Sequence, residues 1–248
     1  MKISLITAVY NRHSTIQESI RSVQSQSYPD VEHVVVDGAS SDGTVKVIKA
    51  ASNEKTVVIS ERDDGIYDAL NKGIAHASGN LIGLMHSDDF FAHNDVLQRV
   101  SEAFSDHSID AVYGDLQYVA QDDTSRVIRH WNAGEFSPLK LSRGWMPPHP
   151  ALFLRSNVFD KHGVYDTSYR IAADYDAILR WFGKGKIKAH YIPEVLVKMR
   201  VGGESNKSLR KILQKSREDY RALRSNDIGG VGALAWKNAS KIRQFIVK

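Results

Sequence analysis

The sequence predicts an α/β fold with a mostly parallel central sheet and a helical appendage at the C-terminus. Its 248 residues, of which 42% are hydrophobic, can form one large domain with a buried core. Up to about Gly114, short β-rich runs alternate with helical patterns, which is typical of βαβ units and a parallel sheet. The predicted strands are ISLITAVY, EHVVVD, TVVIS, LIGLMH and DAVYG.

Helical spacing is clear in two of the segments between these strands. The first, STIQESIRSVQSQ, opens with a capping-box pattern at Ser14 and places Ile16, Ile20 and Val23 on one face. The second has apolar residues at helical spacing until Gly79 ends the pattern: Tyr67, Leu70, Ile74 and Ala77.

The rhythm changes from Leu116 onward. LQYVAQ and RVIRHW predict two strands, and residues 132–150 form a long aperiodic segment that is typical of a binding loop. SNVFDKHG and ADYDAILRWFGK follow, then the strands IKAHYI and VLVKMRV. Residues 207–248 read as two basic amphipathic helices that are split near NDIGGVG.

Composition excludes several classes of site. The absence of cysteine removes disulfides, cysteine zinc sites and thiol nucleophiles. The first apolar run, in MKISLITAVYNR, is only about one strand long and lacks a small-residue cleavage site, so it predicts neither a signal peptide nor a membrane span. No later segment reaches spanning length, and we therefore expect a soluble, cytoplasmic protein.

Polar clusters follow the first four predicted strands, where each strand ends. These are Asn11 with Arg12, then Asp37, then residues 61–64, then residues 86–89. In an open α/β sheet the ligand crevice lies at the carboxyl ends of the strands, so we expect the clusters to meet in one site. Such an acidic crevice suits a divalent cation that bridges to a polyanion.

Two carboxylates allow more than one interpretation. Asp37 ends a strand inside VVVDGASSDGT, where it could accept a hydrogen bond from a nucleobase N–H or from a ribose hydroxyl. Nearby Asp42 equally suits a helix cap. Asp174 in AADYD suits an ordinary helix N-cap, and any catalytic role for it depends on the family resemblance given below.

Linked blocks of sequence resemble a known family. ITAVYNR, SIRSVQSQSYPDVEHVVVDGASSDGT and SERDDGIYDALNKGIAHASGNLIGLMHSDDF, in this order, resemble the nucleotide-binding half of a family 2 glycosyltransferase with the GT-A fold, of the bacterial polysaccharide or O-antigen type. The resemblance resumes at PPHPALFLRSNVFDKHGVYDTSYRIAADYDAILRW. It implies one GT-A domain with a nucleotide-sugar-binding half at 1–115, an acceptor-binding and catalytic-base half at 116–206, and the basic helical tail at 207–248.

The resemblance also implies roles for individual residues. Asp88 matches the last aspartate of the D-x-D motif, which holds Mn²⁺ or Mg²⁺, and Asp174 matches the catalytic base. At the first position of that motif this chain has His86, which could ligate the metal or, with Ser87, contact the nucleotide. The other nucleotide-sugar residues are Ala8, Asp37, Asp63 and Asn71, and the acceptor residues are Trp145 and His149.

The expected activity is transfer of a sugar from a nucleotide-sugar, with UDP as the favoured nucleotide, to a hydroxyl of a glycan or lipid-linked glycan, with inversion. A catalytically inactive sugar-nucleotide or glycan-binding module of the same fold is the alternative, since His86 breaks the D-x-D motif. A dinucleotide-dependent oxidoreductase is disfavoured, because the turn TAVYNRHST contains no glycine.

Charge is distributed unevenly along the chain. Residues 207–248 hold 11 Lys and Arg against 3 Asp and Glu, whereas residues 1–206 hold 22 against 26. A basic tail on an acidic body predicts contact with an anionic membrane surface on the cytoplasmic side, with a solvated helical face as the alternative. We do not expect nucleic-acid binding, and an oligomer through the tail helices stays open.

Overall fold

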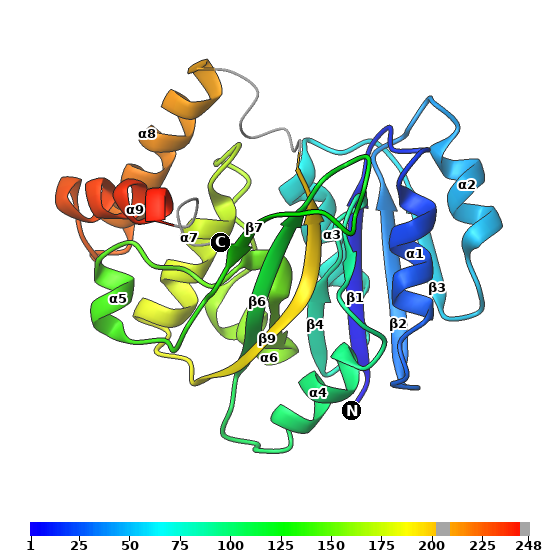
Figure 1. Cartoon of the computed structure of the whole chain (residues 1–248), viewed down its shortest axis with the longest axis horizontal. Helices are drawn as coiled ribbons and strands as arrows, with labels where there is room; N and C mark the ends of the chain where they lie inside the picture. Colours follow the sequence, from blue (N-terminus) through cyan, green and yellow to red (C-terminus); the bar gives the residue numbers. More distant parts are fainter. Residues whose placement is uncertain (202–208, 244–248) are drawn as a thin grey trace.

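The computed structural model describes residues 1–201 and 209–243, and it confirms the α/β fold with a helical C-terminal part (Figure 1). One nine-stranded sheet runs through the protein in the order β3-β2-β1-β4-β8-β6-β9-β5, with β7 paired to β6. The strands are β1 (Ile3–Val9), β2 (Val31–Asp37), β3 (Thr56–Ser60), β4 (Leu81–Leu84), β5 (Phe90–Phe91), β6 (Ala111–Val119), β7 (Val127–Trp131), β8 (Leu152–Arg155) and β9 (Ala189–Arg200).

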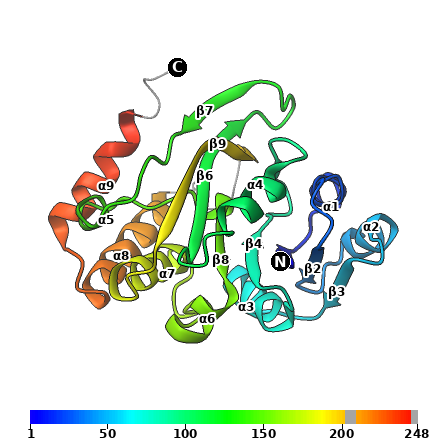
Figure 2. The ribbon, with the colours of Figure 1, turned by 90° about the horizontal axis from the view of Figure 1, so that it is seen from below.

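Helices cover both faces of the sheet (Figure 2). The first four helices are α1 (Ile16–Gln24), α2 (Thr44–Ala51), α3 (Ile66–His76) and α4 (Val96–Ala103). The later ones are α5 (Pro138–Ser142), η1 (His149–Ala151), α6 (Ser156–His162), α7 (Ala173–Ile178) with its continuation η2 (Leu179–Lys184), α8 (Leu209–Ser225) and α9 (Val231–Arg243).

The first four predicted strands are confirmed and form a parallel unit. β1 pairs in parallel with both β2 and β4, and β2 pairs in parallel with β3. Because side chains alternate across a strand, Ile3 and Leu5 pack on the face of α4, while Ile6 and Ala8 pack on the face of α3. All four carboxyl ends therefore reach the same edge of the sheet.

The second half of the sheet corrects the expected number of strands. DAVYG and LQYVAQ form the single strand β6, and IKAHYI and VLVKMRV form the single strand β9. Register shifts between Gly114 and Leu116 let these two long strands stay paired in parallel. The predicted division at residues 115 and 116 thus falls inside β6, and the two halves share one strand.

Local signals were less reliable than the hydrophobic pattern. The capping box expected at Ser14 does not form, since Thr15 is the N-cap of α1 and its side chain makes no capping hydrogen bond. The predicted binding loop at 132–150 contains the short helix α5, whose N-cap Ser137 accepts from the N–H of Lys140.

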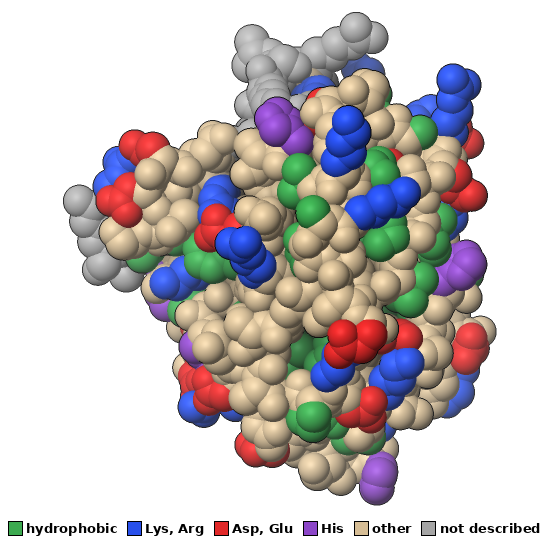
Figure 3. All heavy atoms as spheres, turned by 90° about the vertical axis from the view of Figure 1, so that its right-hand side faces the viewer, with side chains coloured by type: hydrophobic (Ala, Val, Ile, Leu, Met, Phe, Trp, Pro, Cys, Tyr) green, Lys and Arg blue, Asp and Glu red, His purple; other side chains and the backbone are tan. Residues whose placement is uncertain are grey.

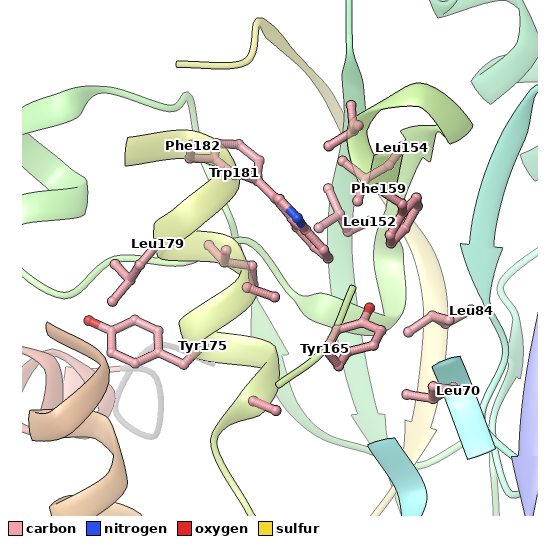
Figure 4. Packing of buried hydrophobic residues seen from close by; sticks show 14 of the residues in the cluster. Leu70, Leu84, Leu152, Leu154, Phe159, Tyr165, Tyr175, Leu179, Trp181 and Phe182 are labelled. Atoms are coloured by element: carbon pink, nitrogen blue, oxygen red, sulfur yellow. The ribbon is translucent and has the colours of Figure 1, made fainter. Parts of the chain in front are cut away.

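The core under α3, α6 and α7 is rich in aromatic rings (Figure 4). Trp181 is fully buried against Phe159, with ring centroids 5.3 Å apart, and against Tyr165, at 5.7 Å. This packing fixes α7 and η2 against β8 and α6, and so fixes the segment that carries Asp174.

The C-terminal helices pack against the rest of the domain. Asn226, directly after α8, joins this part of the chain to α7 by a hydrogen bond of 2.9 Å from its Nδ2 to Asp176 Oδ1, and both residues are buried. α9 is joined to α8 by the buried pair Lys237 and Asp219, with Nζ and Oδ1 2.9 Å apart. Within residues 1–201 and 209–243, no helix combines the length and apolar character needed to cross a bilayer.

The side of the molecule away from α8 and α9 has a surface of mixed charged, polar and hydrophobic side chains (Figure 1 and Figure 3). Figure 3 shows the face on the β3 side, where acidic and basic side chains are interspersed and hydrophobic side chains show in small separate areas. β3 is correspondingly the least buried of the four parallel strands, with Val57 43% exposed.

Glu32 on β2 ties the amino ends of the parallel strands together. Its carboxylate accepts hydrogen bonds from the Ser4 hydroxyl, from the N–H and hydroxyl of Ser78, and it pairs with Lys2 Nζ at 2.7 Å. Burial would raise the pKa of Glu32, but the bonds from Lys2, Ser4 and Ser78 outweigh it and lower the pKa from 4.5 to about 2.

Glu32→Gln is expected to destabilise the fold at pH 7 by about 3 kcal/mol, the free energy that corresponds to this pKa shift. A lowered folded-state pKa stabilises above the unfolded value of 4.5, and this stabilisation is lost as the pH falls toward 2. Urea unfolding should therefore show the gap between wild type and variant shrinking from pH 7 to pH 3. Exposed Glu54→Gln is the control, and a gap that is constant with pH would contradict the prediction.

Candidate functional site

A cleft of about 1010 Å³ lies at the carboxyl ends of the parallel strands, where the sequence predicted a site. It is lined by residues from both halves of the chain. Seven of the predicted site residues line it: Ala8, Asp63, His86, Ser87, Asp88, His149 and Asp174.

One part of the cleft lining is built from the chain after β1 and the start of α3. Tyr10, Asn11 and Arg12 follow β1 and line the cleft. Asn11 adopts φ 50, and its N–H donates to Ser40 Oγ at 2.8 Å, so the loops after β1 and β2 hold each other. The sequence indicated Asn11 and Arg12 as a polar cluster but gave Tyr10 no role.

Asp37 lies behind this part of the cleft lining rather than in it. It is fully buried at the end of β2, and its Oδ2 accepts from the N–H of Ser40 at 3.0 Å and from Ser60 Oγ at 2.8 Å. Its Oδ1 is buried and has no hydrogen-bond partner among the described residues. Asp63 lies so close to this turn that a Cβ on Gly38 would come 2.3 Å from Asp63 Oδ2, so only glycine fits there.

Two further predicted residues, Asn71 and Trp145, lie outside the cleft lining. Asn71 on α3 exchanges hydrogen bonds with the backbone of Tyr165, at 2.8 and 3.0 Å, and so joins α3 to the chain before α7. Trp145 belongs to the aromatic core, since its Nε1 donates to the carbonyl of Ala133 at 2.8 Å and its ring packs on Tyr113. In the 132–150 segment Ala133, Leu141 and Trp145 pack into the core, whereas Leu139 is exposed and Met146 lines the cleft.

The chain turns sharply after β4 and sends its two adjacent aspartates in different directions. Asp89 is fully buried, and its Oδ1 accepts from the N–H of Arg200 at 3.2 Å. Burial, and then the charge of Asp88, raises the pKa of Asp89 well above its usual range. Asp88 instead lines the cleft, while its backbone carbonyl accepts from the Arg200 guanidinium at 2.5 Å.

The side chains around Asp88 fit a divalent ion that takes its remaining ligands from a diphosphate. Among the described residues, the Asp88 carboxylate accepts no hydrogen bond, and no group of three or more His, Asp or Glu side chains is arranged to hold a metal alone. Mg²⁺ typically binds one or two carboxylates together with substrate phosphates. Burial lowers the pKa of His86, so its imidazole is neutral and is a possible further ligand.

Asp174 lines the same cleft and lies in the first turn of α7. The N-cap of α7 is Ala172, which corrects the alternative interpretation of Asp174 as a cap. Its Oδ1 accepts from the N–H of Tyr175 at 2.8 Å and from the hydroxyl of Tyr67 at 3.3 Å. Burial, and then the charge of Asp174, raises the pKa of Tyr67 well above 10, so its hydroxyl remains a donor.

The charge state of Asp174 follows from its surroundings. Burial would raise the pKa of Asp174, but the positive charges of Lys215, of Lys237 and, when it is protonated, of His149 outweigh it and hold the pKa below its usual range. Burial lowers the pKa of His149 to about 4, and its Nε2 lies 2.8 Å from the Tyr165 hydroxyl. At neutral pH the cleft therefore holds a charged Asp174 carboxylate beside uncharged imidazoles.

Sequence reasoning missed the contribution of the C-terminal part of the chain. Lys211 and Gln214 on α8 line the cleft, and so does Arg170 in the segment before α7. Tyr67 appeared in the sequence only as an apolar helix position. An apolar part of the lining comes from the second half of the sheet and the loop before η1: Leu116, Tyr118, Trp131, Met146 and Met199.

Solved structures share this fold. TarS of S. aureus (residues 1–349), in complex with UDP-GlcNAc, superposes with a TM-score of 0.72 at 18% identity, over 91% of this chain and 65% of that one. The chain spans 39% of the longer TarS structure. The mannosyltransferase PcManGT from Pyrobaculum calidifontis, in complex with GDP-Man and Mn²⁺, has a TM-score of 0.66 at 17% identity, over 100% of this chain and 76% of that one.

Sequence comparison identifies relatives at higher identity. An uncharacterized glycosyltransferase of Mycobacterium tuberculosis is 36% identical over 180 residues, which cover 72% of this chain and 68% of the relative. A PGL/p-HBAD biosynthesis glycosyltransferase of Mycobacterium bovis is 30% identical over 208 residues, or 82% of this chain and 78% of the relative. The family model described as Glycosyl transferase family 2 matches residues 4–167. With its GT-A fold, the chain belongs to glycosyl transferase family 2.

Proposed function

We propose that the protein transfers one sugar from a nucleotide-sugar to a hydroxyl of a glycan or lipid-linked glycan, with inversion. The observation that carries this proposal is that Asp88, from the first half of the chain, and Asp174, from the second half, line one cleft. Residues 1–115 supply the nucleotide-sugar half, and residues 116–206 supply most of the acceptor half. UDP is the favoured nucleotide, and assembly of a bacterial cell-surface polysaccharide such as O-antigen is the proposed setting.

In this proposal the nucleoside diphosphate lies against Ala8, Asp63, Ser87 and Asp88. A bound Mn²⁺ or Mg²⁺, held by Asp88 with His86 as a possible second ligand, would neutralise the charge that builds up on the departing diphosphate. The PcManGT complex with Mn²⁺ supports a metal in this fold. Asp37 accepts a hydrogen bond from the nucleobase through its Oδ1, which has no partner among the described residues, once the loops around it adjust.

The acceptor hydroxyl loses its proton to Asp174 as it attacks the anomeric carbon. Asp174 suits this role because it lines the cleft and its low pKa keeps it ionised. His149 lines the same cleft, and its ring centroid is 6.3 Å from that of His86, so in this proposal it lies next to both the donor and the acceptor. In this proposal the acceptor attacks the face of the anomeric carbon opposite the departing diphosphate, which gives inversion.

Release of nucleoside diphosphate tests the proposed function directly. The purified protein, given Mn²⁺ and a panel of UDP-, GDP- and dTDP-sugars without acceptor, is expected to hydrolyse at least one donor slowly. Calorimetric binding of a donor without any release, also in the presence of lipid-linked and free glycan acceptors, would favour the inactive binding module instead. Neither binding nor release with any donor would contradict both.

The acceptor's location motivates a second proposal, that the C-terminal helices meet an anionic membrane surface. Leu139, Val231 and Trp236 are 59%, 70% and 55% exposed, and the Arg143 guanidinium lies 5.8 Å from the Trp236 ring centroid. A Cβ on Gly144 would come 2.6 Å from Lys237 Cβ, so the end of α5 packs directly on α9. We call Leu139, Arg143, Val231 and Trp236 the α5–α9 patch; it combines an aromatic anchor with positive charge.

Trp236→Ala with Val231→Ser is expected to lower the fraction of protein that sediments with vesicles containing phosphatidylglycerol by severalfold. The control is Val57→Ser, which removes an equally apolar exposed side chain from β3 at the far edge of the sheet. Equal sedimentation of all three proteins would contradict this use of the patch.

A further inference from the structure

Helix α8 reaches from the C-terminal part of the chain into the wall of the cleft. Its residues Lys211 and Gln214 line the cleft. Gln214 Nε2 donates to Glu218 Oε1 at 2.9 Å, one turn further along the helix. The side chain of Glu218 is thus held in place from the cleft side.

The other carboxylate oxygen of Glu218 binds the backbone that leads into α7. Oε2 accepts from the N–H of Ile171 at 2.8 Å and from the N–H of Ala172 at 3.0 Å. N–H groups at the start of a helix have no partner within it, so a carboxylate that accepts two of them makes charge-assisted bonds. Glu218 lies 47 positions from Ile171 in the chain, which makes this a tertiary contact and not a local cap.

The same segment is held from its other side by α3. The hydroxyl of Tyr67 donates to the carbonyl of Ile171 at 2.7 Å and also lies 3.3 Å from Asp174 Oδ1. Residue 171 is therefore clamped between α8, through its N–H, and α3, through its carbonyl. Asp174 follows three residues later, in the first turn of the helix that this clamp orients.

We propose that Glu218 is a positioning residue for Asp174: it fixes the 171–172 backbone and thereby the direction in which the Asp174 carboxylate faces the acceptor. This rests on the proposed function, in which Asp174 accepts the proton. Glu218 does not line the cleft and touches no substrate in this proposal. The C-terminal helices are then part of the active site, as well as a membrane-facing surface.

The expected cost of losing this clamp is large for transfer and small for donor binding. A displacement of about 1 Å at a reacting group can lower the rate about 100-fold. In the proposed function the donor lies against Ala8, Asp63, Ser87 and Asp88, and Glu218 bonds instead to Gln214 and the 171–172 backbone, so the donor dissociation constant should stay within about twofold of wild type. This separation of kcat from donor affinity is what a loss of stability alone would not produce.

The experiment compares Glu218→Met, which keeps the length of the side chain and removes both oxygens, with Asn226→Ala, directly after the C-terminal end of α8. Asn226 also joins α8 to α7, through Asp176, but it does not contact the 171–172 backbone. Amide hydrogen exchange at Ile171 and Ala172 is measured alongside kcat, donor binding and thermal unfolding. Glu218→Gln, which keeps one acceptor oxygen without its charge, is the partial-rescue variant.

Glu218→Met is expected to show faster exchange at both amides and a kcat about 100-fold lower than wild type. Glu218→Gln is expected to fall between Glu218→Met and wild type in exchange rate and in kcat. Asn226→Ala is expected to match wild type in both quantities. Protected amides in Glu218→Met, or a kcat no lower than that of Asn226→Ala, would overturn the proposal. If Glu218→Met does not fold, Glu218→Gln decides: unchanged exchange and kcat overturn the proposal. An unaffected kcat in Asp174→Asn would instead refute the base assignment and leave the exchange result standing.

Discussion

Asp174→Asn is expected to lower kcat for sugar transfer by between about 100-fold and about 10,000-fold, the range that a general base contributes. The amide keeps the size of the side chain and can still accept the Tyr67 and Tyr175 hydrogen bonds, but it cannot take the acceptor's proton. Donor binding should remain, because the residues proposed to contact the nucleoside diphosphate are unchanged. Radiolabelled transfer and calorimetric donor titration measure the two effects separately.

The low pKa of Asp174 adds a pH dependence to this prediction. Because its pKa is lower than that of an ordinary aspartate, Asp174 stays ionised throughout the range from pH 7 to pH 5. The transfer rate of the wild type should therefore stay constant over this range. Asp160→Asn, on the exposed face of α6, is the matched control and should transfer at the wild-type rate. Transfer by Asp174→Asn at the rate of Asp160→Asn would remove Asp174 from the mechanism.

Asp88→Ala is expected to abolish the part of nucleotide binding that depends on metal. In wild type, adding Mn²⁺ to metal-free protein should tighten the dissociation constant for UDP, since a carboxylate and the diphosphate can share the ion. We expect the variant to lose at least about 100-fold of this affinity, as weaker changes around metal ligands already cost about 10- to 100-fold. Calorimetry with Mn²⁺ and with EDTA measures both states.

The controls for this experiment separate the ligands from the general charge of the cleft. Asp64→Asn removes an exposed carboxylate near the cleft and should retain the full metal effect. His86→Ala shows whether the imidazole adds a ligand, by the size of the effect that remains. If Asp88→Ala binds UDP with the same dependence on Mn²⁺ as Asp64→Asn, the metal assignment fails.

The parallel half of the sheet could be predicted because its signals are local. Each of β1 to β4 is a short apolar run that ends at a cluster of polar residues, so the pattern marks both the strand and its end. The convergence of Ala8, Asp63 and Asp88 then follows from the parallel arrangement. Asp37 and Asp89 show the limit, because sequence cannot tell which of several carboxylates turns inward.

The contribution of α8 could not be predicted for a different physical reason. Glu218, Asp219 and Lys237 have the composition of a solvated helical face, and only tertiary contacts reveal that Asp219 and Lys237 are buried as a pair. Likewise, the aperiodic segment around Trp145 looked like a surface loop because its apolar residues pack against distant elements and follow no local period. In both cases the partners are far away in the chain.

The position of β8 between β4 and β6 has a consequence for how the protein is made. β1 to β4 are complete once residue 84 has left the ribosome, but the strand that connects them to β6 ends only at residue 155. The first part of β6, Ala111–Tyr113, pairs with β8 and β9, so it stays without its neighbours for several seconds at roughly 5–20 residues per second. Nascent chains that stall between residues 120 and 150 would expose this strand to association with other chains, and a holdase chaperone would bind them there.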